Sequence, residues 1–466
     1  MFTDSIKNFS KHKAVVTDLG QQLTYHELHG QASQLFEKVR ERCLVFCLCK
    51  NCVESLVGYV SFLSNRIVPV MLDASLKEEM LNGLVEIYKP RYVWLPIERC
   101  NELKEYYSMY SQNEYVLLRS KLHLNAEIHD SLALLLTTSG STGSPKLVRL
   151  SYENVFSNAR SIAMYLSINP DERPITTLPM HYTFGLSVIN SHLIQGATIL
   201  LTDRSLMEKE FWQFLKNEKA TSLSGVPYTY EILKKLRFFK MDLPSLRTLT
   251  QAGGRLSIEL QKEFAEYCLA KNKRFFVMYG QTEATARMSY LPYERVLEKL
   301  GSIGIAIPGG EFSLKDENGI LITESGRSGE LVYKGSNVSL GYAESADDLK
   351  KGDDNNGILY TGDISQRDND NFFYIVGREK RFIKVFGNRV NLDETEQLLK
   401  SFITDCACIG TDDHMVIYIT ENGREEDVKK FISAKTGLNH SVFDIRYCES
   451  IPKNSSGKTL YTNLAL

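Results

Sequence analysis

The feature that most constrains the fold is an apolar run that passes into a polar, glycine-containing loop and then resumes. Residues 134–150 read LLLTTSGSTGSPKLVRL, with leucines before the loop and Leu147 and Val148 after it. The apolar flanks predict two buried strands joined by the loop. Glycine lets backbone N–H groups close around an anion, and Lys146 adds a positive charge, so the loop is suited to bind polyphosphate.

This loop differs from the common P-loop, in which GxxxxGK[ST] opens a helix. Here Pro145 precedes the lysine, and Leu147 stands where that motif requires Ser or Thr. The alternative interpretation is a polar surface loop between two strands, and the remaining sequence distinguishes the two.

Apolar, strand-like runs alternate with segments of helical periodicity over most of the chain, which predicts an α/β fold with parallel sheets flanked by helices. Strands are expected at 14–17, 22–25, 43–49, 67–72, 92–95, 174–178, 197–201, 246–251 and 274–279, and helices at 25–40, 53–65, 76–88, 151–166, 184–194, 206–217, 227–235 and 258–270. The second run repeats the pattern of the first, so two α/β subdomains are expected. Residues 106–124 are poorly patterned and are predicted to be irregular.

The pattern changes near residue 301, where glycines and polar turns separate short strands. Strands at 311–315, 329–334, 357–360 and 371–375 predict a small β-rich subdomain. The last segment is predicted to be α+β, with helices at 391–401 and 425–436, strands at 407–410 and 415–420, and a polar tail. We therefore expect a large N-terminal domain over 1–377 and a small, mobile C-terminal domain over 378–466.

The composition excludes several classes of protein. Lys plus Arg number 55 against 57 Asp plus Glu, so nothing indicates a general nucleic-acid surface. The nine cysteines are odd in number and lack zinc spacing, which indicates reduced thiols. There is no apolar run long enough to span a membrane and no secretory leader pattern, so a cytoplasmic location is expected.

Five further motifs follow the polyphosphate loop. They are LPMHYTFGLS at 178–187, QAGGRL at 251–256 with YGQTEAT at 279–285, YTGD at 360–363, GREKRFIKVFGNRV at 377–390 and PKNSSGK at 452–458. Together with TTSGSTGSPK at 137–146, they resemble the ordered signatures of the adenylate-forming superfamily. That superfamily includes acyl-CoA synthetases, adenylation domains of peptide synthetases, and luciferases. The first 130 residues resemble it only loosely.

The resemblance implies an ATP site and a magnesium site. It places the triphosphate on Thr138, Ser139, Gly140, Ser141, Thr142, Gly143 and Lys146, the adenine and α-phosphate on Gly253, Gly254, Arg255, Tyr279, Gly280 and Thr282, and the ribose on Asp363 and Arg378. Glu283 is implied as a ligand of Mg²⁺, which prefers hard oxygen donors.

Catalytic roles are implied in the same way. Lys458 matches the family's catalytic lysine, which stabilises charge on the bridging oxygen, and His181 borders the entry of the substrate carboxylate. Lys380 matches the residue about which the C-terminal domain rotates. Gly387 lies in the loop that lines the approach of the thiol.

The implied reaction joins a carboxylic acid to a thiol through acyl-AMP, with release of pyrophosphate. Amino-acid-activating relatives carry an aspartate where this chain has Gly185, so the resemblance implies a fatty or aryl acid without an α-amino group. The thiol would be coenzyme A or the phosphopantetheine arm of an acyl carrier protein. The alternatives are an amino-acid–carrier-protein ligase, an enzyme that stops at acyl-AMP, and a nucleotide-binding scaffold without catalysis.

Overall fold

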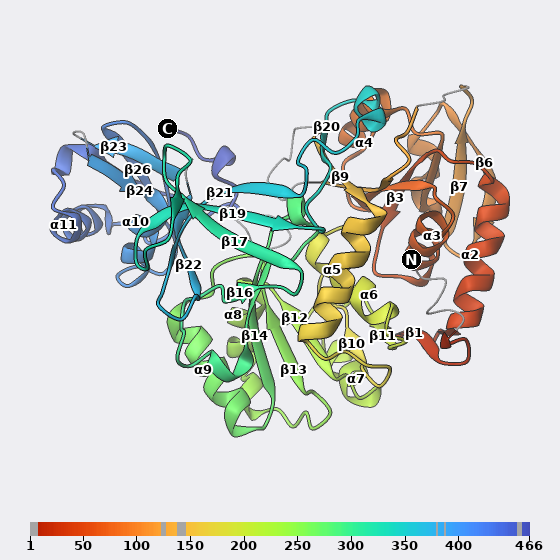
Figure 1. The fold of residues 1–466 in the computed structure, drawn as a ribbon, viewed down its shortest axis with the longest axis horizontal. Coiled ribbons are helices and arrows are strands. Elements are labelled where there is room, and N and C mark those ends of the chain that lie inside the picture. Colours follow the sequence, from red (N-terminus) through yellow and green to blue (C-terminus); the bar gives the residue numbers. More distant parts are fainter. Residues whose placement is uncertain (1–7, 123–126, 138–145, 379–380, 386–387, 454–458) are drawn as a thin grey trace. The chain divides into compact units, whose positions relative to one another are not determined.

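The computed structural model describes residues 8–122, 127–137, 146–378, 381–385, 388–453 and 459–466. Contacts between residues divide the chain into two compact units (Figure 1). The N-terminal unit comprises residues 1–301, 306–311 and 334–359, and the C-terminal unit comprises 302–305, 312–333 and 360–466. The expected boundary between residues 377 and 378 stays a prediction. The fold is mixed α/β, as expected.

The N-terminal unit contains two large sheets. The first has the strand order β15-β14-β13-β12-β10-β11-β1-β2, and β16 (Ile305–Ala306) pairs at its β15 edge. Its strands are β1 (Lys13–Thr17), β2 (Gln22–Thr24), β10 (Pro174–Ile175), β11 (Ile199–Leu201), β12 (Ser222–Gly225), β13 (Thr248–Gln251), β14 (Arg274–Tyr279) and β15 (Ser289–Leu291). β10, β12, β13 and β14 are parallel neighbours, so their carboxyl ends lie at one edge.

The second sheet has the strand order β20-β9-β8-β4-β3-β5-β7-β6. Its strands are β3 (Leu44–Cys49), β4 (Val68–Asp73), β5 (Tyr92–Pro96), β6 (Tyr106–Gln112), β7 (Tyr115–Ser120), β8 (Leu132–Thr137), β9 (Leu147–Ser151) and β20 (Gly341–Ala343). β8 and β9 are antiparallel and buried, and they flank the hydroxyl-rich loop as predicted.

The helices of the N-terminal unit agree with the periodicity of the sequence. They are α2 (Tyr25–Val39), α3 (Val53–Ser64), α4 (Glu78–Tyr88), α5 (Tyr152–Tyr165), α6 (Thr183–Leu193), α7 (Lys209–Asn217), α8 (Pro227–Lys235) and α9 (Ile258–Ala270). The side chains of Thr24 and Ser151 cap α2 and α5, each accepting a hydrogen bond from a backbone N–H of the first turn. Figure 1 shows α5 and α6 packed together, and their contacts confirm it.

The prediction that residues 106–124 are irregular was wrong. β6 and β7 form an antiparallel hairpin across Asn113 and Glu114, and β7 continues the sheet beside β5. Asn113 has φ 49°, a left-handed conformation that asparagine tolerates better than most residues. Because β6 is largely exposed, its sequence lacks the apolar alternation that would have revealed a strand. The prediction also missed β12, a short strand of serines and small residues.

The C-terminal unit contains a five-stranded sheet of order β18-β17-β19-β21-β22 and a three-stranded sheet of order β25-β26-β27. Their strands are β17 (Gly310–Lys315), β18 (Leu321–Ile322), β19 (Ser328–Gly335), β21 (Ile358–Arg367), β22 (Phe373–Arg378), β25 (Cys406–Thr411), β26 (His414–Ile419) and β27 (Phe443–Tyr447). The hairpin β23 (Phe382–Val385)–β24 (Asn388–Asn391) and helices α10 (Leu392–Lys400) and α11 (Glu425–Thr436) complete it.

The predicted polar tail was wrong in part, because β27 lies within it and pairs in parallel with β26. The nine cysteines are all free thiols, as expected. Among the helices of the described residues, none has the length and apolar character that a membrane crossing requires.

Candidate active site

Three of the predicted loops follow the carboxyl ends of neighbouring strands in the first sheet. The 252–256 loop follows β13, the 280–287 loop follows β14, and the 178–182 loop comes after β10. Ligands bind at this edge in open α/β sheets. The fold therefore gathers these three predicted segments at one edge of the sheet.

The 280–287 loop is a compact turn built around Gly280. A Cβ atom on Gly280 would lie 1.6 Å from the backbone oxygen of Ala286, so only glycine fits. Thr285 and Ala286 have φ values of 57° and 112°, and the backbone N–H of Met288 donates to the oxygen of Tyr279 to close the turn. Non-glycine residues adopt such conformations only when the surroundings enforce them, which is frequent at functional sites.

Glu283 is held by a tyrosine from a distant segment. The hydroxyl of Tyr342, on β20, donates to Glu283 Oε1 at 2.8 Å. Burial, with the charge of Glu283, raises the pKa of Tyr342, so the phenol stays protonated and can donate. Lys146 Nζ lies 3.6 Å from the centroid of the same ring. Tyr342 thus links the lysine at the end of the hydroxyl-rich loop to the predicted magnesium ligand.

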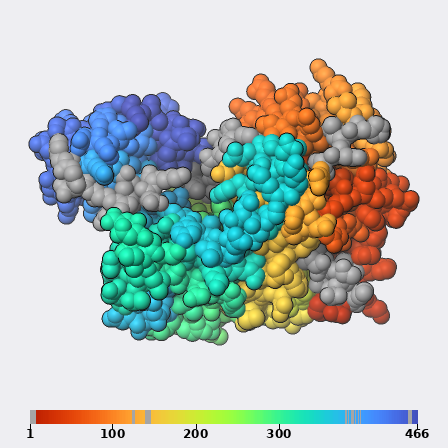
Figure 2. Space-filling view, turned by 45° about the horizontal axis from the view of Figure 1, so that its top comes forward, coloured from red at the N-terminus to blue at the C-terminus, as the bar shows by residue number. Residues whose placement is uncertain are grey.

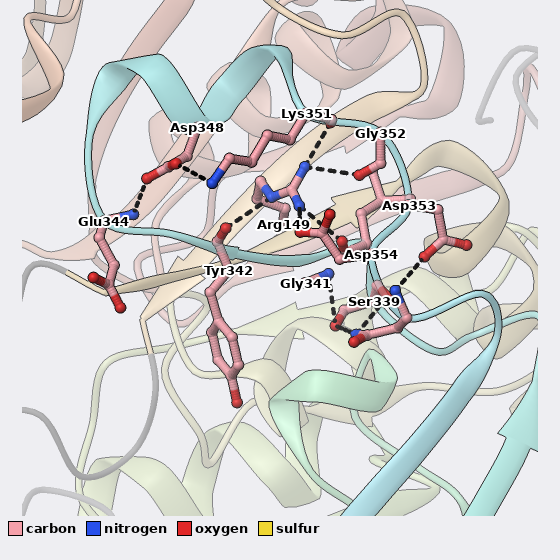
Figure 3. A network of polar contacts seen from close by, with 12 residues as sticks. Arg149, Ser339, Gly341, Tyr342, Glu344, Asp348, Lys351, Gly352, Asp353 and Asp354 are labelled. Atoms are coloured by element: carbon pink, nitrogen blue, oxygen red, sulfur yellow. Dashed lines mark hydrogen bonds and ion pairs between the residues drawn. The ribbon is translucent and has the colours of Figure 1, made fainter.

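A buried arginine fixes the strand that carries Tyr342 (Figure 3). The Arg149 side chain is fully buried and donates to the backbone oxygens of Leu340, Tyr342, Lys351 and Gly352 at 2.6–3.0 Å. It also pairs with the carboxylate of Asp354. The four backbone oxygens that accept from Arg149 all belong to residues 334–359. In Figure 2 this segment lies beside orange residues from the first third of the chain. Arg149 therefore holds the segment that brings Tyr342 to Glu283.

His181 is largely buried in the loop after β10. Its Nε2 lies 3.6 Å from Asp73 Oδ2, and its Nδ1 has no hydrogen-bond partner in the described structure. Burial lowers the pKa of His181, although the charges of Asp73 and Asp203 oppose this, so the ring is neutral near pH 7. Asn51 orders the loop by donating to the oxygen of Leu178 and accepting from the N–H of Met180.

The glycines of the 252–256 loop lie at the surface beside Tyr182. Gly253 has φ 81°, and a Cβ there would lie 2.6 Å from the hydroxyl of Tyr182. Gln251, which is buried, donates to the oxygen of Gly254 at 2.8 Å and closes the loop. Arg255 is exposed at the end of the loop.

In the C-terminal unit, Asp363 and Arg378 face each other across β21 and β22. Arg378 Nε donates to Asp363 Oδ1 at 2.9 Å, and the carboxylate is buried while the arginine is half-exposed. The predicted ribose pair is therefore brought together. Lys380, Gly387, Lys458 and residues 138–143 lie outside the described residues, so their predicted roles stay predictions.

The segments on either side of Lys458 are described. The N–H of Leu460 donates to the oxygen of Pro452 at 2.8 Å, and Lys453 pairs with Asp405 at 2.7 Å. The Tyr461 hydroxyl donates to Glu396 at 3.0 Å, and its ring lies 3.8 Å from the guanidinium of Arg381. These contacts hold in place the described residues that precede and follow positions 454–458.

Two contributors were missed in the sequence. Neither Tyr342 nor Asn51 received a role from the sequence. Their contacts join residues 59 and 127 positions apart, respectively, so no local pattern could have revealed them.

Comparison with known proteins shows the family of the chain. The family model described as AMP-binding enzyme matches residues 2–343, which includes the first 130 residues that resembled the family only loosely. Asp363, Arg378 and the later motifs lie beyond that match. The chain is 29% identical to luciferin 4-monooxygenase of Nipponoluciola cruciata over 345 residues, which cover 71% of this chain and 62% of the luciferase.

Other relatives match over more of their length. A 2-succinylbenzoate–CoA ligase from Bacillus cereus is 26% identical over 464 residues, which cover 95% of this chain and 93% of the relative. The structure of o-succinylbenzoate CoA synthetase from Bacillus subtilis, in complex with an acyl-adenylate intermediate, shares the fold with a TM-score of 0.82 at 22% identity, covering 99% of this chain and 96% of that one. Since the family model spans most of the chain, this protein belongs to the AMP-binding enzyme family.

Proposed function

We propose that the chain is an AMP-forming acid–thiol ligase that activates a carboxylic acid with ATP and transfers the acyl group to coenzyme A. The observation that carries the proposal is the Lys146–Tyr342–Glu283 arrangement, in which one tyrosine contacts both a lysine and a carboxylate within the N-terminal unit. Relatives named as CoA ligases match over nearly the whole chain.

In the first step, the substrate carboxylate attacks the α-phosphorus of ATP and pyrophosphate leaves. The hydroxyl-rich loop and Lys146 would bind the leaving phosphates, Thr282 would donate to the α-phosphate, and Lys458 would stabilise the bridging oxygen. Such a reaction needs positioning and electrostatic stabilisation more than covalent chemistry from the protein.

The carboxylate of Glu283 is a suitable ligand for a magnesium ion that is bound to the triphosphate of ATP. Mg²⁺ is bound by one or two carboxylates together with substrate phosphates and water, rather than by an all-protein cage. Glu283 supplies one carboxylate, and Tyr342 orients it through Oε1. Bound there, the ion would neutralise charge on the phosphates.

The second step would use the same site after the C-terminal domain, residues 378–466, rotates about Lys380. Rotation would withdraw Lys458 and bring the loop with Gly387 beside the acyl-AMP. The thiol then attacks the acyl carbon and AMP leaves. A single site that serves two reactions needs such an exchange of residues. A carrier-protein phosphopantetheine is the other candidate thiol.

The surroundings of Gly185 support an acid without an α-amino group. A Cβ at this position would lie 2.2 Å from the backbone oxygen of Pro179 and 3.0 Å from that of Leu178. An aspartate could not be accommodated without a shift of the His181 loop. Because position 185 is a glycine, the first turn of α6 has no carboxylate there to pair with an ammonium group.

Pyrophosphate release over a panel of fatty, aryl and amino acids, with and without coenzyme A, tests the proposal. Release that requires an unaminated acid, with an acyl-CoA product, is the expected result. Release that coenzyme A leaves unchanged would point to a carrier protein. No release with any acid would contradict the proposed function and favour a nucleotide-binding scaffold.

Replacing Tyr342 with phenylalanine is expected to raise the Mg²⁺ concentration needed for half-maximal pyrophosphate release by about tenfold. The change removes the donor to Glu283 but keeps the ring beside Lys146, and partners that orient a metal ligand contribute about this much. Tyr92→Phe is the matched control, because that hydroxyl donates to Glu41 at 3.0 Å elsewhere in the unit. An unchanged magnesium dependence in Tyr342→Phe would contradict the role assigned to Tyr342.

A further inference from the structure

Arg287 is a buried cation that has no counter-charge among the residues that the structure describes. It is 2% exposed and lies at the end of the loop that carries Glu283. Its Nη1 donates to the hydroxyl of Tyr165 and to the sulfur of Met278, both at 3.1 Å, and its Nε has no acceptor. In the part of the chain that the structure describes, no Asp or Glu forms an ion pair with it.

Comparison with Arg149 shows that Arg287 has few hydrogen-bond acceptors for a buried arginine. Both arginines are almost fully buried, but Arg149 meets four carbonyl oxygens and a carboxylate. Arg287 meets one neutral hydroxyl, one weakly accepting thioether and the face of Phe184, whose centroid is 4.9 Å from its Cζ. Buried charges in proteins are ordinarily paired, because desolvation of an unpaired ion is strongly unfavourable.

The cation lies beside the 178–187 segment, whose His181 is expected to border the entry of the substrate carboxylate. Phe184 and Met278 belong to an apolar cluster with Val188 and Val226, against which Tyr182 packs. Tyr182 follows His181 directly and Phe184 lies three residues after it, and the hydroxyl of Tyr182 borders Gly253. Burial lowers the pKa of the neighbouring His192 to about 4, and the charge of Arg287 adds to the effect, so this histidine is neutral near pH 7 and does not add a second positive charge.

We infer that Arg287 binds an anionic group at the far end of the acid substrate, so that the enzyme activates dicarboxylic acids. The inference rests on the proposed function and names the substrate class of the same site. The planar guanidinium would donate hydrogen bonds from its unpaired N–H groups to a second carboxylate of the substrate, while the first carboxylate reacts with ATP. A site built for this contact would reject an acid that lacks the second charge.

The test compares adipate with monomethyl adipate and terephthalate with monomethyl terephthalate, in wild type and in Arg287→Met. Wild type is expected to favour at least one diacid over its monoester by about 100-fold in kcat/KM for pyrophosphate release. Arg287→Met should remove this preference and leave the KM for ATP unchanged. Equal use of each pair, or a preference that survives the substitution, would overturn the inference without affecting the proposed function.

Thermal unfolding separates a binding role from a structural one. Arg287→Met should unfold at or above the wild-type temperature, because an apolar chain of similar size replaces an uncompensated charge. Arg149→Met, the matched control, should unfold well below it, because five acceptors lose their donor. An Arg287→Met protein that is as destabilised as Arg149→Met, or that does not fold, would show a structural role and overturn the inference.

If no acid supports pyrophosphate release, thermal unfolding can still test the role of Arg287 separately from the proposed ligase function. The diacids and their monoesters are then added to wild type and to Arg287→Met with AMP present. A rise in unfolding temperature with a diacid in wild type alone would support the role of Arg287 although the proposed function had failed. No shift with any of the four acids would overturn both.

Discussion

Replacing Gly280 with alanine is expected to cost about 3 kcal/mol of the free energy of unfolding and to abolish acid-dependent pyrophosphate release. The added Cβ would lie 1.6 Å from the oxygen and 2.6 Å from the carbon of Ala286, and 2.7 Å from the Cα of Arg287. These are backbone atoms, so no change of side-chain rotamer relieves the overlap. The loop itself must open.

Opening this loop would displace several groups together. Thr285 donates through its hydroxyl to the oxygen of Asn337, and Asn337 donates back to the oxygens of Ala284 and Arg287. A shift of the turn would therefore break its contacts with the 334–359 segment and move Glu283 away from Tyr342. We therefore expect Gly280→Ala to lose pyrophosphate release and free energy of unfolding together.

Chemical denaturation and pyrophosphate release, measured on the same preparations, check this prediction. Gly30→Ala is the matched control, because Gly30 lies exposed in α2 and an added Cβ meets nothing within 4 Å. That variant should be more stable than wild type by about 0.5–1 kcal/mol, since alanine favours helix over glycine. A Gly280→Ala protein with wild-type stability would show that the loop is not as tightly closed as described.

The sequence predicted the strands beside the motifs correctly where those strands are buried. β8 and β14 are rich in apolar residues, β9 and β13 are more mixed in sequence but buried, and the motifs begin or end with these four strands. Buried strands of this kind leave a signal in the local sequence, so the motifs beside them could be placed at strand ends without a structure. The β6–β7 hairpin escaped because its outer strand is held by backbone pairing and by an asparagine in the left-handed region.

The partners of the site residues could not be predicted in this way. Glu283 was identified from its motif, but nothing near it in the sequence indicates that Tyr342 donates to it. Arg287 likewise reads as an ordinary arginine four residues after Glu283. Only the structure shows that it is buried among apolar side chains and has no carboxylate partner in the described part of the chain. The absence of a carboxylate partner for a buried arginine cannot be recognised from the sequence.

Replacing Lys458 with alanine is expected to slow acyl-AMP formation by about 1,000-fold, because the loss of one group that stabilises developing charge has effects of this size. The fold should be preserved. Lys453 and Asp405, the backbone bond from Leu460 to Pro452, and the Tyr461–Glu396 hydrogen bond all lie on either side of the substituted position. Lys430→Ala, which removes an exposed lysine from α11, is the matched control and should be fully active.

The second half-reaction distinguishes a catalytic lysine from a merely structural one. If Lys458 acts only in adenylation and then leaves the site, Lys458→Ala supplied with synthetic acyl-AMP should form the thioester at nearly the wild-type rate. A structural lesion would slow both half-reactions together. Thioester formation that falls as far as adenylation would thus contradict the proposed exchange of residues between the two steps, whereas selective loss of adenylation would place Lys458 at the bridging oxygen in the first step alone.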